Sequence, residues 1–80
     1  MYLHIGTNTY LRMTRIIGIF PGTLLLENFE EQPFLSQVTI VNNELQPEEA
    51  KSCILIDTNT LYLSNVNSRT LRQRWNALKV

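Results

Sequence analysis

Basic side chains are the groups in this sequence whose spacing most clearly suggests a chemistry. Arg12 and Arg15 flank a short break between two strand-like segments, and Lys51 precedes a run of apolar residues. The other four cations stand in the last twelve residues, at Arg69, Arg72, Arg74 and Lys79. Cations that a rigid sheet holds at its rim are suited to binding phosphate. Ordinary exposure to solvent is the simpler explanation for each of them taken alone, and the spacing leaves both interpretations open.

The formal net charge is zero, but the charges are segregated along the chain. Residues 1–26 contain two arginines and no acid, and residues 27–57 contain all seven acids with one lysine. The tail contains the remaining four cations and no acid. The folded protein can therefore present a basic face to a polyanion, or stack a basic surface on the acidic surface of another copy.

The other reactive residues form no catalytic or metal-binding pattern. We expect Cys53, within an apolar strand, to be a buried and inert thiol, and His4 in "YLHIG" to be a hydrogen-bonded sheet residue. One cysteine and one histidine do not make a zinc site. The chain shows no Gly-rich phosphate loop, paired catalytic carboxylates or Cys-x-x-Cys motif. The sequence predicts no enzyme, no catalytic or metal site, no cofactor and no small-molecule substrate.

With 80 residues, of which 44% are hydrophobic, the chain is long enough for one small domain, residues 1–80. A core of this size is marginal, and small scaffolds usually gain stability from disulfides, metals or partner subunits. Self-association is the alternative that remains here. The start lacks the pattern of a secretory signal, and no apolar run approaches the roughly 20 residues of a membrane span. We therefore expect a cytoplasmic homo-oligomer without a membrane partner.

Alternation of apolar and polar residues predicts strands at residues 2–5 and then two segments, "YLRM" and "RIIGIF", broken near Thr14. The segment "IIGIF" is apolar on both faces, which suggests a central or an interface strand. A turn follows at Pro21-Gly22, where Gly22 can adopt a positive φ. Residues 23–50 carry mixed signals, with one short strand expected at 37–41.

The C-terminal third is clearer. Strands at 51–56 and 61–66, joined by the turn "DTNT", predict a hairpin. A helix over 68–78 follows, capped by Asn67 or Ser68. The predicted architecture is α+β: a small antiparallel β-sheet with a C-terminal helix.

The predicted helix is amphipathic. Its apolar stripe consists of Leu71, Trp75 and Leu78, so we expect Trp75 in the core or a subunit interface rather than as a base-stacking platform. A second face carries Arg69, Arg72, Asn76 and Lys79, with Arg74 on the opposite flank. These cations could contact phosphates, but any amphipathic helix needs a polar face. We favour solvation of a packed helix or contact with a neighbouring subunit.

Three segments in this order, "MYLHIG", "RIIGIF" and "KSCILIDTNTLYLSNVNSRTLRQRW", resemble the bacterial extracellular-matrix regulatory protein family typified by RemA and RemB. The opening Met1-Tyr2-x-His4-x-Gly6 and the pair Lys51-Ser52 are closer to the RemB branch. The best motif, "IDTNTLYLSNVNSRTL", resembles the family pattern Asp-Ser-x-x-x-x-x-Ser-x-Val before a helix. The resemblance covers both ends, roughly half of the chain.

The resemblance implies a non-enzymatic DNA-binding transcription regulator that acts on genes for biofilm matrix. It also implies a LytTR-like fold and a ring-shaped homo-oligomer that presents basic residues to double-stranded DNA. Arg15 matches a basic position in the N-terminal strand region, and Lys51 matches the last residue of a basic cluster before the hairpin. Arg12 joins them as a candidate DNA-binding residue.

Glu48 and Glu49 stand where RemA-type members have an arginine pair, and carboxylates there would repel phosphate. Two hypotheses therefore remain. In the first, the protein is an oligomeric DNA-binding regulator whose phosphate contacts are Arg15, Lys51 and Arg12. In the second, it is an oligomeric protein-interaction or scaffold subunit that has lost DNA binding, with its basic helix against the acidic segment of a neighbour.

Overall fold

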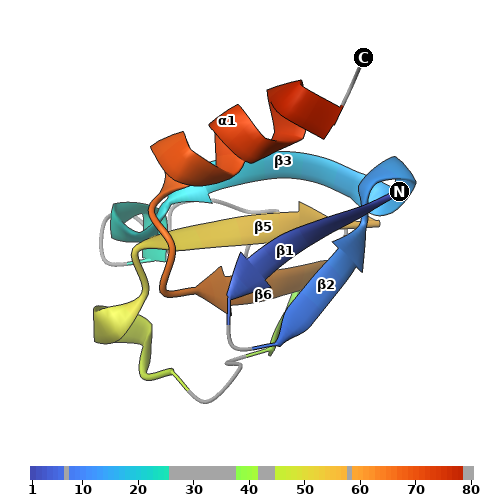
Figure 1. The fold of residues 1–80 in the computed structure, drawn as a ribbon. Helices are drawn as coiled ribbons and strands as arrows, with labels where there is room; N and C mark the ends of the chain where they lie inside the picture. The colour runs from blue at the N-terminus through green and yellow to red at the C-terminus, as the bar shows by residue number, and fades with distance from the viewer. Residues whose placement is uncertain (7, 26–37, 42–44, 58, 79–80) are drawn as a thin grey trace.

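Strands and one C-terminal helix account for most of the residues that the structure, a computed structural model, describes: 1–6, 8–25, 38–41, 45–57 and 59–78. The strands are β1 (Tyr2–Gly6), β2 (Thr9–Arg12), β3 (Ile16–Pro21), β4 (Thr39–Val41), β5 (Ser52–Ile56) and β6 (Thr60–Ser64). The remaining elements are the 3₁₀ turns η1 (Met13–Arg15), η2 (Gly22–Leu25) and η4 (Pro47–Glu49), and helix α1 (Ser68–Leu78) (Figure 1). The α+β class is confirmed. No helix among the described residues has both the length and the apolar character that crossing a bilayer demands.

The strands form two sheets, and one of these is mixed, whereas we predicted a single antiparallel sheet. β1 and β2 pair as an antiparallel hairpin, and the other strands form a sheet in the order β3-β5-β6-β4. β5 is antiparallel to both of its neighbours, but β4 runs parallel to β6. The difference arises because β4 precedes β5 in the chain yet lies beyond β6. The chain therefore crosses the sheet after β4 instead of turning back in a hairpin.

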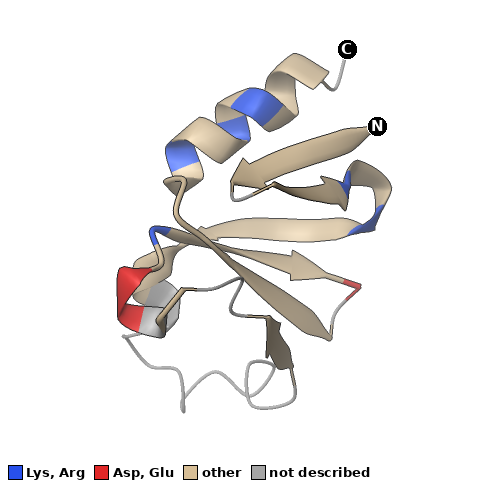
Figure 2. Cartoon of the chain, turned by 60° about the horizontal axis from the view of Figure 1, so that its bottom comes forward, with Lys and Arg blue, Asp and Glu red and all other residues tan. Residues whose placement is uncertain are grey.

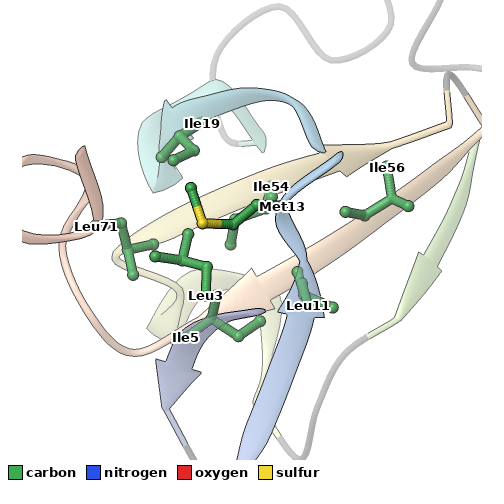
Figure 3. Packing of buried hydrophobic residues seen from close by; sticks show 8 residues of the cluster. All are labelled: Leu3, Ile5, Leu11, Met13, Ile19, Ile54, Ile56 and Leu71. Atoms are coloured by element: carbon green, nitrogen blue, oxygen red, sulfur yellow. The ribbon is translucent and has the colours of Figure 1, made fainter. Parts of the chain in front are cut away.

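Strand β5 is the centre of the packing, because all of its residues are buried. Successive side chains of a strand point to opposite faces, so Ile54 and Ile56 lie on one face while Cys53 and Leu55 lie on the other. The β1–β2 hairpin and α1 cover the first face (Figure 1). The main apolar cluster there consists of Leu3, Ile5, Leu11, Met13, Ile19, Ile54, Ile56 and Leu71 (Figure 3). Cys53 and Leu55 pack with Leu61 and Leu63 in a second cluster.

The expected buried thiol at Cys53 is confirmed. The side chain has no exposed surface, and its thiol donates to the carbonyl oxygen of Pro21, with the sulfur 3.7 Å away. Burial raises the pKa of the Cys53 thiol to about 11. The group is therefore protonated at neutral pH and is a poor nucleophile.

Several local predictions hold. The break near Thr14 is the turn η1, and β5 and β6 form the expected antiparallel hairpin, with Ser52 opposite Ser64. Asp57 begins the turn between them with a φ of 51°. Asp and Asn tolerate this left-handed conformation better than most side chains because they are short and polar.

β3 is an edge strand, although one of our interpretations of "IIGIF" placed it in the centre of a sheet. Its pairing with β5 shifts between Ile16 and Gly18, and such a bulge turns a residue out of the ladder. The side chain of Ile17 is accordingly 59% exposed. The central position was wrong, and the interpretation of β3 as an interface strand stays a prediction.

The bend after β3 is present, but Gly22 does not adopt a positive φ. Its N–H donates to the carbonyl oxygen of Lys51 at 3.0 Å. A Cβ at this position would lie 2.0 Å from the carbonyl oxygen of Ala50. The prediction of a positive φ was therefore wrong, and glycine is needed here because the backbone before β5 passes so close.

Helix α1 has the predicted bounds, cap and apolar stripe. The N–H of Thr70 donates to Oδ1 of Asn67 at 2.8 Å, which satisfies one of the free donors of the first turn. Leu71 is fully buried, and Trp75 and Leu78 pack against the main cluster. Lys79, which we placed on the basic face, lies outside the described residues.

Two arginines of α1 bind the backbone of the strands on either side of the helix. Nη2 of Arg72 donates to the carbonyl oxygen of Ile19 in β3 at 2.8 Å. Nη1 of Arg74 donates to the carbonyl oxygen of His4 in β1 at 3.0 Å. Because β3 and β1 belong to different sheets, α1 joins the two sheets through both polar flanks as well as through its apolar stripe. Arg72 and Arg74 therefore support packing within the chain, whereas we expected the cations of this helix to be solvated or to contact a neighbouring subunit.

Buried hydroxyl groups make a further link between the two sheets. Oγ of Ser64 donates to the carbonyl oxygen of Ile5 at 2.6 Å and accepts from the N–H of Val66 at 3.0 Å. Oγ of Ser52 donates to the carbonyl oxygen of Val66 at 2.6 Å. Both serine side chains are fully buried, so no water can replace these partners.

Replacing Ser64 with alanine should lower the free energy of unfolding by about 1–3 kcal/mol, because the buried carbonyl of Ile5 and the part-buried N–H of Val66 lose their partner. Urea unfolding followed by circular dichroism measures this. Thr14→Val, which removes an exposed hydroxyl in η1, is the control and should change stability by less than about 0.5 kcal/mol. Equal effects of the two substitutions would contradict the role given to Ser64.

Candidate nucleic-acid interface

The outer face of the β1–β2 hairpin is aromatic and basic. Leu3 and Leu11 face each other on the inner side, so the alternate residues point outward. Tyr2 lies opposite Arg12, and His4 lies opposite Tyr10. The guanidinium carbon of Arg12 is 5.9 Å from the centre of the Tyr2 ring, and the ring centres of His4 and Tyr10 are 4.7 Å apart. The rings of Tyr2 and Tyr10 are therefore each held in place by one neighbouring side chain, Arg12 and His4 respectively.

Packing of the hairpin on β5 places this outer face beside β6 and the turn η1. Between them lies a groove of about 390 Å³, which we call the tyrosine–arginine groove. Its lining residues are Tyr2, Tyr10, Leu11, Arg12, Arg15, Ile56, Thr60 and Tyr62. The groove thus combines three phenol rings with two guanidinium groups, drawn from β1, β2, η1, β5 and β6.

Arg15 in the groove is held by Asp57. Nε of Arg15 donates to Oδ2 of Asp57 at 2.8 Å, and Nη2 contacts the same oxygen. The backbone supports the pair, because the N–H of Asp57 donates to the carbonyl oxygen of Arg15 at 3.1 Å. The hydrogen bond from Arg15 lowers the pKa of Asp57, and the same bond raises the pKa of Arg15. Solvent reaches both side chains, which are 59% and 38% exposed, so a phosphate can compete with the carboxylate for Arg15.

The structure brings two of the three predicted DNA-binding residues together and separates the third. Arg12 and Arg15 line the same groove. Lys51 precedes β5 whereas Asp57 and Arg15 meet at its other end, about 20 Å away at roughly 3.3 Å per residue. Lys51 lies instead near η4, which carries the exposed Glu48 and Glu49 (Figure 2).

Sequence reasoning missed the tyrosines of the groove. Tyr2 and Tyr10 alternate with buried leucines, and Tyr62 stands between the buried Leu61 and Leu63. This alternation was the signal that could have placed Tyr2 and Tyr10 on the solvent-facing side of the hairpin. Tyr62 lies instead on the face of β6 that packs against the main cluster, where it is half-buried. No local sequence pattern predicts that β6 and the β1–β2 hairpin, which are far apart in the chain, line the same groove.

The tyrosine–arginine groove offers aromatic faces and hydrogen-bond donors suited to a planar and anionic ligand. No group of three His, Cys, Asp or Glu residues that could hold a metal ion occurs in the described parts of the chain. No protein-family model matches the chain, and no curated protein matches its sequence. The function of the groove must therefore be inferred from its own residues.

The Arg15–Asp57 pair makes a pH-dependent prediction. Because Arg15 stabilises the carboxylate, Asp57 should take up its proton only at a pH below the ordinary range, and the pair should persist above that pH. Arg15→Ala should raise the pKa of Asp57 toward its ordinary value, as measured by carboxyl-carbon NMR titration. Arg12→Ala, which removes a partner of Tyr2 instead, should leave it unchanged. An unchanged pKa in Arg15→Ala would refute the pairing in solution.

Proposed function

We propose that this protein is a DNA-binding transcription regulator without enzymatic activity, and that the tyrosine–arginine groove binds the phosphate backbone. The observation that carries the proposal is the convergence of Arg12 and Arg15, both exposed, on one groove. Phosphate contacts of this kind supply most of the affinity of proteins for DNA irrespective of sequence. Arg12 and Arg15 are the phosphate contacts within one copy of the chain.

Glu48 and Glu49, which stand where RemA-type members have an arginine pair, should oppose DNA binding less than we expected from the sequence. Glu48 and Glu49 belong to η4, at the end of β5 opposite the groove (Figure 2). At about 20 Å, which exceeds the Debye length of about 8 Å at physiological salt, their repulsion of a phosphate at Arg15 is screened. Within the described part of the chain, the acid near the groove is Asp57, which Arg15 already pairs.

The resemblance to the RemA and RemB family supports regulation of biofilm-matrix genes in the cytoplasm, a LytTR-like fold and a ring of identical subunits. A ring repeats Arg12 and Arg15 at fixed intervals, so several weak contacts act together through their effective concentration. In such a ring, Lys51 of a neighbouring copy can also contact the same duplex, although Lys51 is remote from the groove of its own chain. The small core and the position of β3 at an edge among the described strands also favour self-association.

Arg15→Glu should weaken binding to a DNA duplex by about tenfold or more at low salt. It should also reduce the slope of log K against log salt by roughly 0.9, because one phosphate contact is lost. Fluorescence anisotropy over a range of salt concentrations measures both quantities. Lys51→Glu makes the same change of charge at the far end of β5 and should cost less. If neither Arg15→Glu nor Lys51→Glu changes the affinity for the duplex, the groove is not the binding site.

A second candidate function, an oligomeric protein-interaction or scaffold subunit, is favoured by a different surface. A groove of about 430 Å³ runs between the edge strand β3 and α1. Its lining residues are Ile16, Ile17, Gly18, Ile19, Phe20, Arg72, Trp75 and Asn76. Open sheet edges with exposed apolar residues pair readily with another strand. Arg72 takes part in this groove while bound to the Ile19 carbonyl, so it is a poor residue for testing the contact.

Ile17→Lys should shift the protein toward smaller species if β3 forms the subunit contact, because a charge would be buried at the edge of the sheet. Size-exclusion chromatography with light scattering measures this. Gln73→Lys adds the same charge at an exposed position of α1 and should not change the mass. An unchanged mass in Ile17→Lys would contradict β3 as the subunit contact. If the protein is a scaffold subunit, it will not bind DNA at any salt concentration.

A further inference from the structure

The two tyrosines on the outer face of the hairpin have more exposed surface than their role in packing explains. Tyr2 is 55% exposed and Tyr10 is 60% exposed, although both belong to regular strands. Their neighbours hold them in place, since His4 stacks beside Tyr10, and Arg12 lies near the Tyr2 ring and donates to its hydroxyl at 3.4 Å. Rings that are ordered before binding lose little conformational freedom when a ligand stacks on them.

A DNA duplex cannot stack the faces of its bases on such exposed rings. It presents phosphates and the edges of its bases, while the faces of the bases are stacked on one another. An unpaired strand offers the faces themselves, and aromatic side chains with basic neighbours are the usual platform for it. Arg12 and Arg15 supply those neighbours within the same groove.

The spacing of the rings also suits an unpaired strand. Because Tyr2 lies opposite Arg12, Tyr10 is its diagonal neighbour across the hairpin, at about 7–8 Å between Cα atoms. Neighbouring nucleotides in a duplex strand rise by only about 3.4 Å. Bases on both rings must therefore be drawn apart, which an extended single strand permits. The volume of the groove, about 390 Å³, is within the range of sites for small ligands.

From these observations we infer that the tyrosine–arginine groove binds single-stranded nucleic acid, with bases stacked on Tyr2 and Tyr10 and phosphates on Arg12 and Arg15. This inference rests on the proposed function and narrows it: the regulator holds unpaired bases, as in a locally opened duplex, and reads base faces rather than groove edges. The phosphates displace the carboxylate of Asp57 from Arg15 when the strand binds.

Fluorescence anisotropy of the full chain with labelled oligonucleotides of about twelve nucleotides tests the inference, since single-strand sites of about this size are common. The probes are oligothymidylate, oligouridylate, an abasic strand with the same number of phosphates, and a duplex of equal length. Oligothymidylate should bind about tenfold tighter than the abasic strand and tighter than the duplex. If oligouridylate binds as tightly as oligothymidylate, the site accepts single strands with either sugar.

Tyr10→Ala should remove most of the advantage of oligothymidylate over the abasic strand, and Tyr10→Phe, which keeps the ring, should preserve it. The comparison of oligothymidylate with the abasic strand uses the unaltered protein, so it remains decisive even if the alanine variant is unstable. Equal affinity for these two probes, or tighter binding of the duplex, would overturn the inference while leaving the proposed function in place. Absence of binding to every probe at low salt would overturn both.

Discussion

The packing of the β1–β2 hairpin on strand β5 is the contact on which the rest of the structure depends. Ile54 and Ile56 offer an apolar face, and the hairpin covers it with Leu3 and Leu11. Apolar contact alone is not directional, so it does not set the position of one sheet on the other. That position is set by hydrogen bonds from Ser64 to Ile5, from Arg74 to His4 and from Arg72 to Ile19.

This packing explains why two pairs of arginines have different roles. The cations of α1 are the most concentrated group in the sequence. Arg72 and Arg74, however, each donate a hydrogen bond to a backbone carbonyl group, in β3 and β1 respectively. Arg12 and Arg15, which are isolated in the sequence, reach the solvent beside three tyrosines. Zero net charge therefore says little about binding, because the charges that matter are separated from Glu48 and Glu49 by the length of β5.

Local patterns were sufficient for the elements that local forces specify. The β5–β6 hairpin followed from its alternation and its turn residues, and α1 followed from the Asn67 cap and the spacing of Leu71, Trp75 and Leu78. Arg12 and Arg15 could likewise be selected as candidates, because both stand at a break between strands.

Long-range arrangement was not predictable in the same way. The apolar pattern of "IIGIF" does not distinguish a central strand from an edge strand whose bulge exposes Ile17. The parallel pairing of β4 with β6 depends on a connection that passes from β4 to β5 across β6, and no turn residue predicts such a connection. The tyrosine–arginine groove requires Tyr2, Tyr10 and Tyr62 to meet, and these come from three strands in two sheets.

Binding of nucleic acid at the tyrosine–arginine groove is tested most directly by a map of amide chemical-shift changes, by ¹H–¹⁵N NMR, as a single-stranded oligonucleotide is added to the full chain. The largest changes should occur in β1, β2, η1 and the start of β6, around Tyr10, Arg12 and Arg15. The largest changes at Lys51 and η4, or along α1 and β3, would contradict binding at this groove.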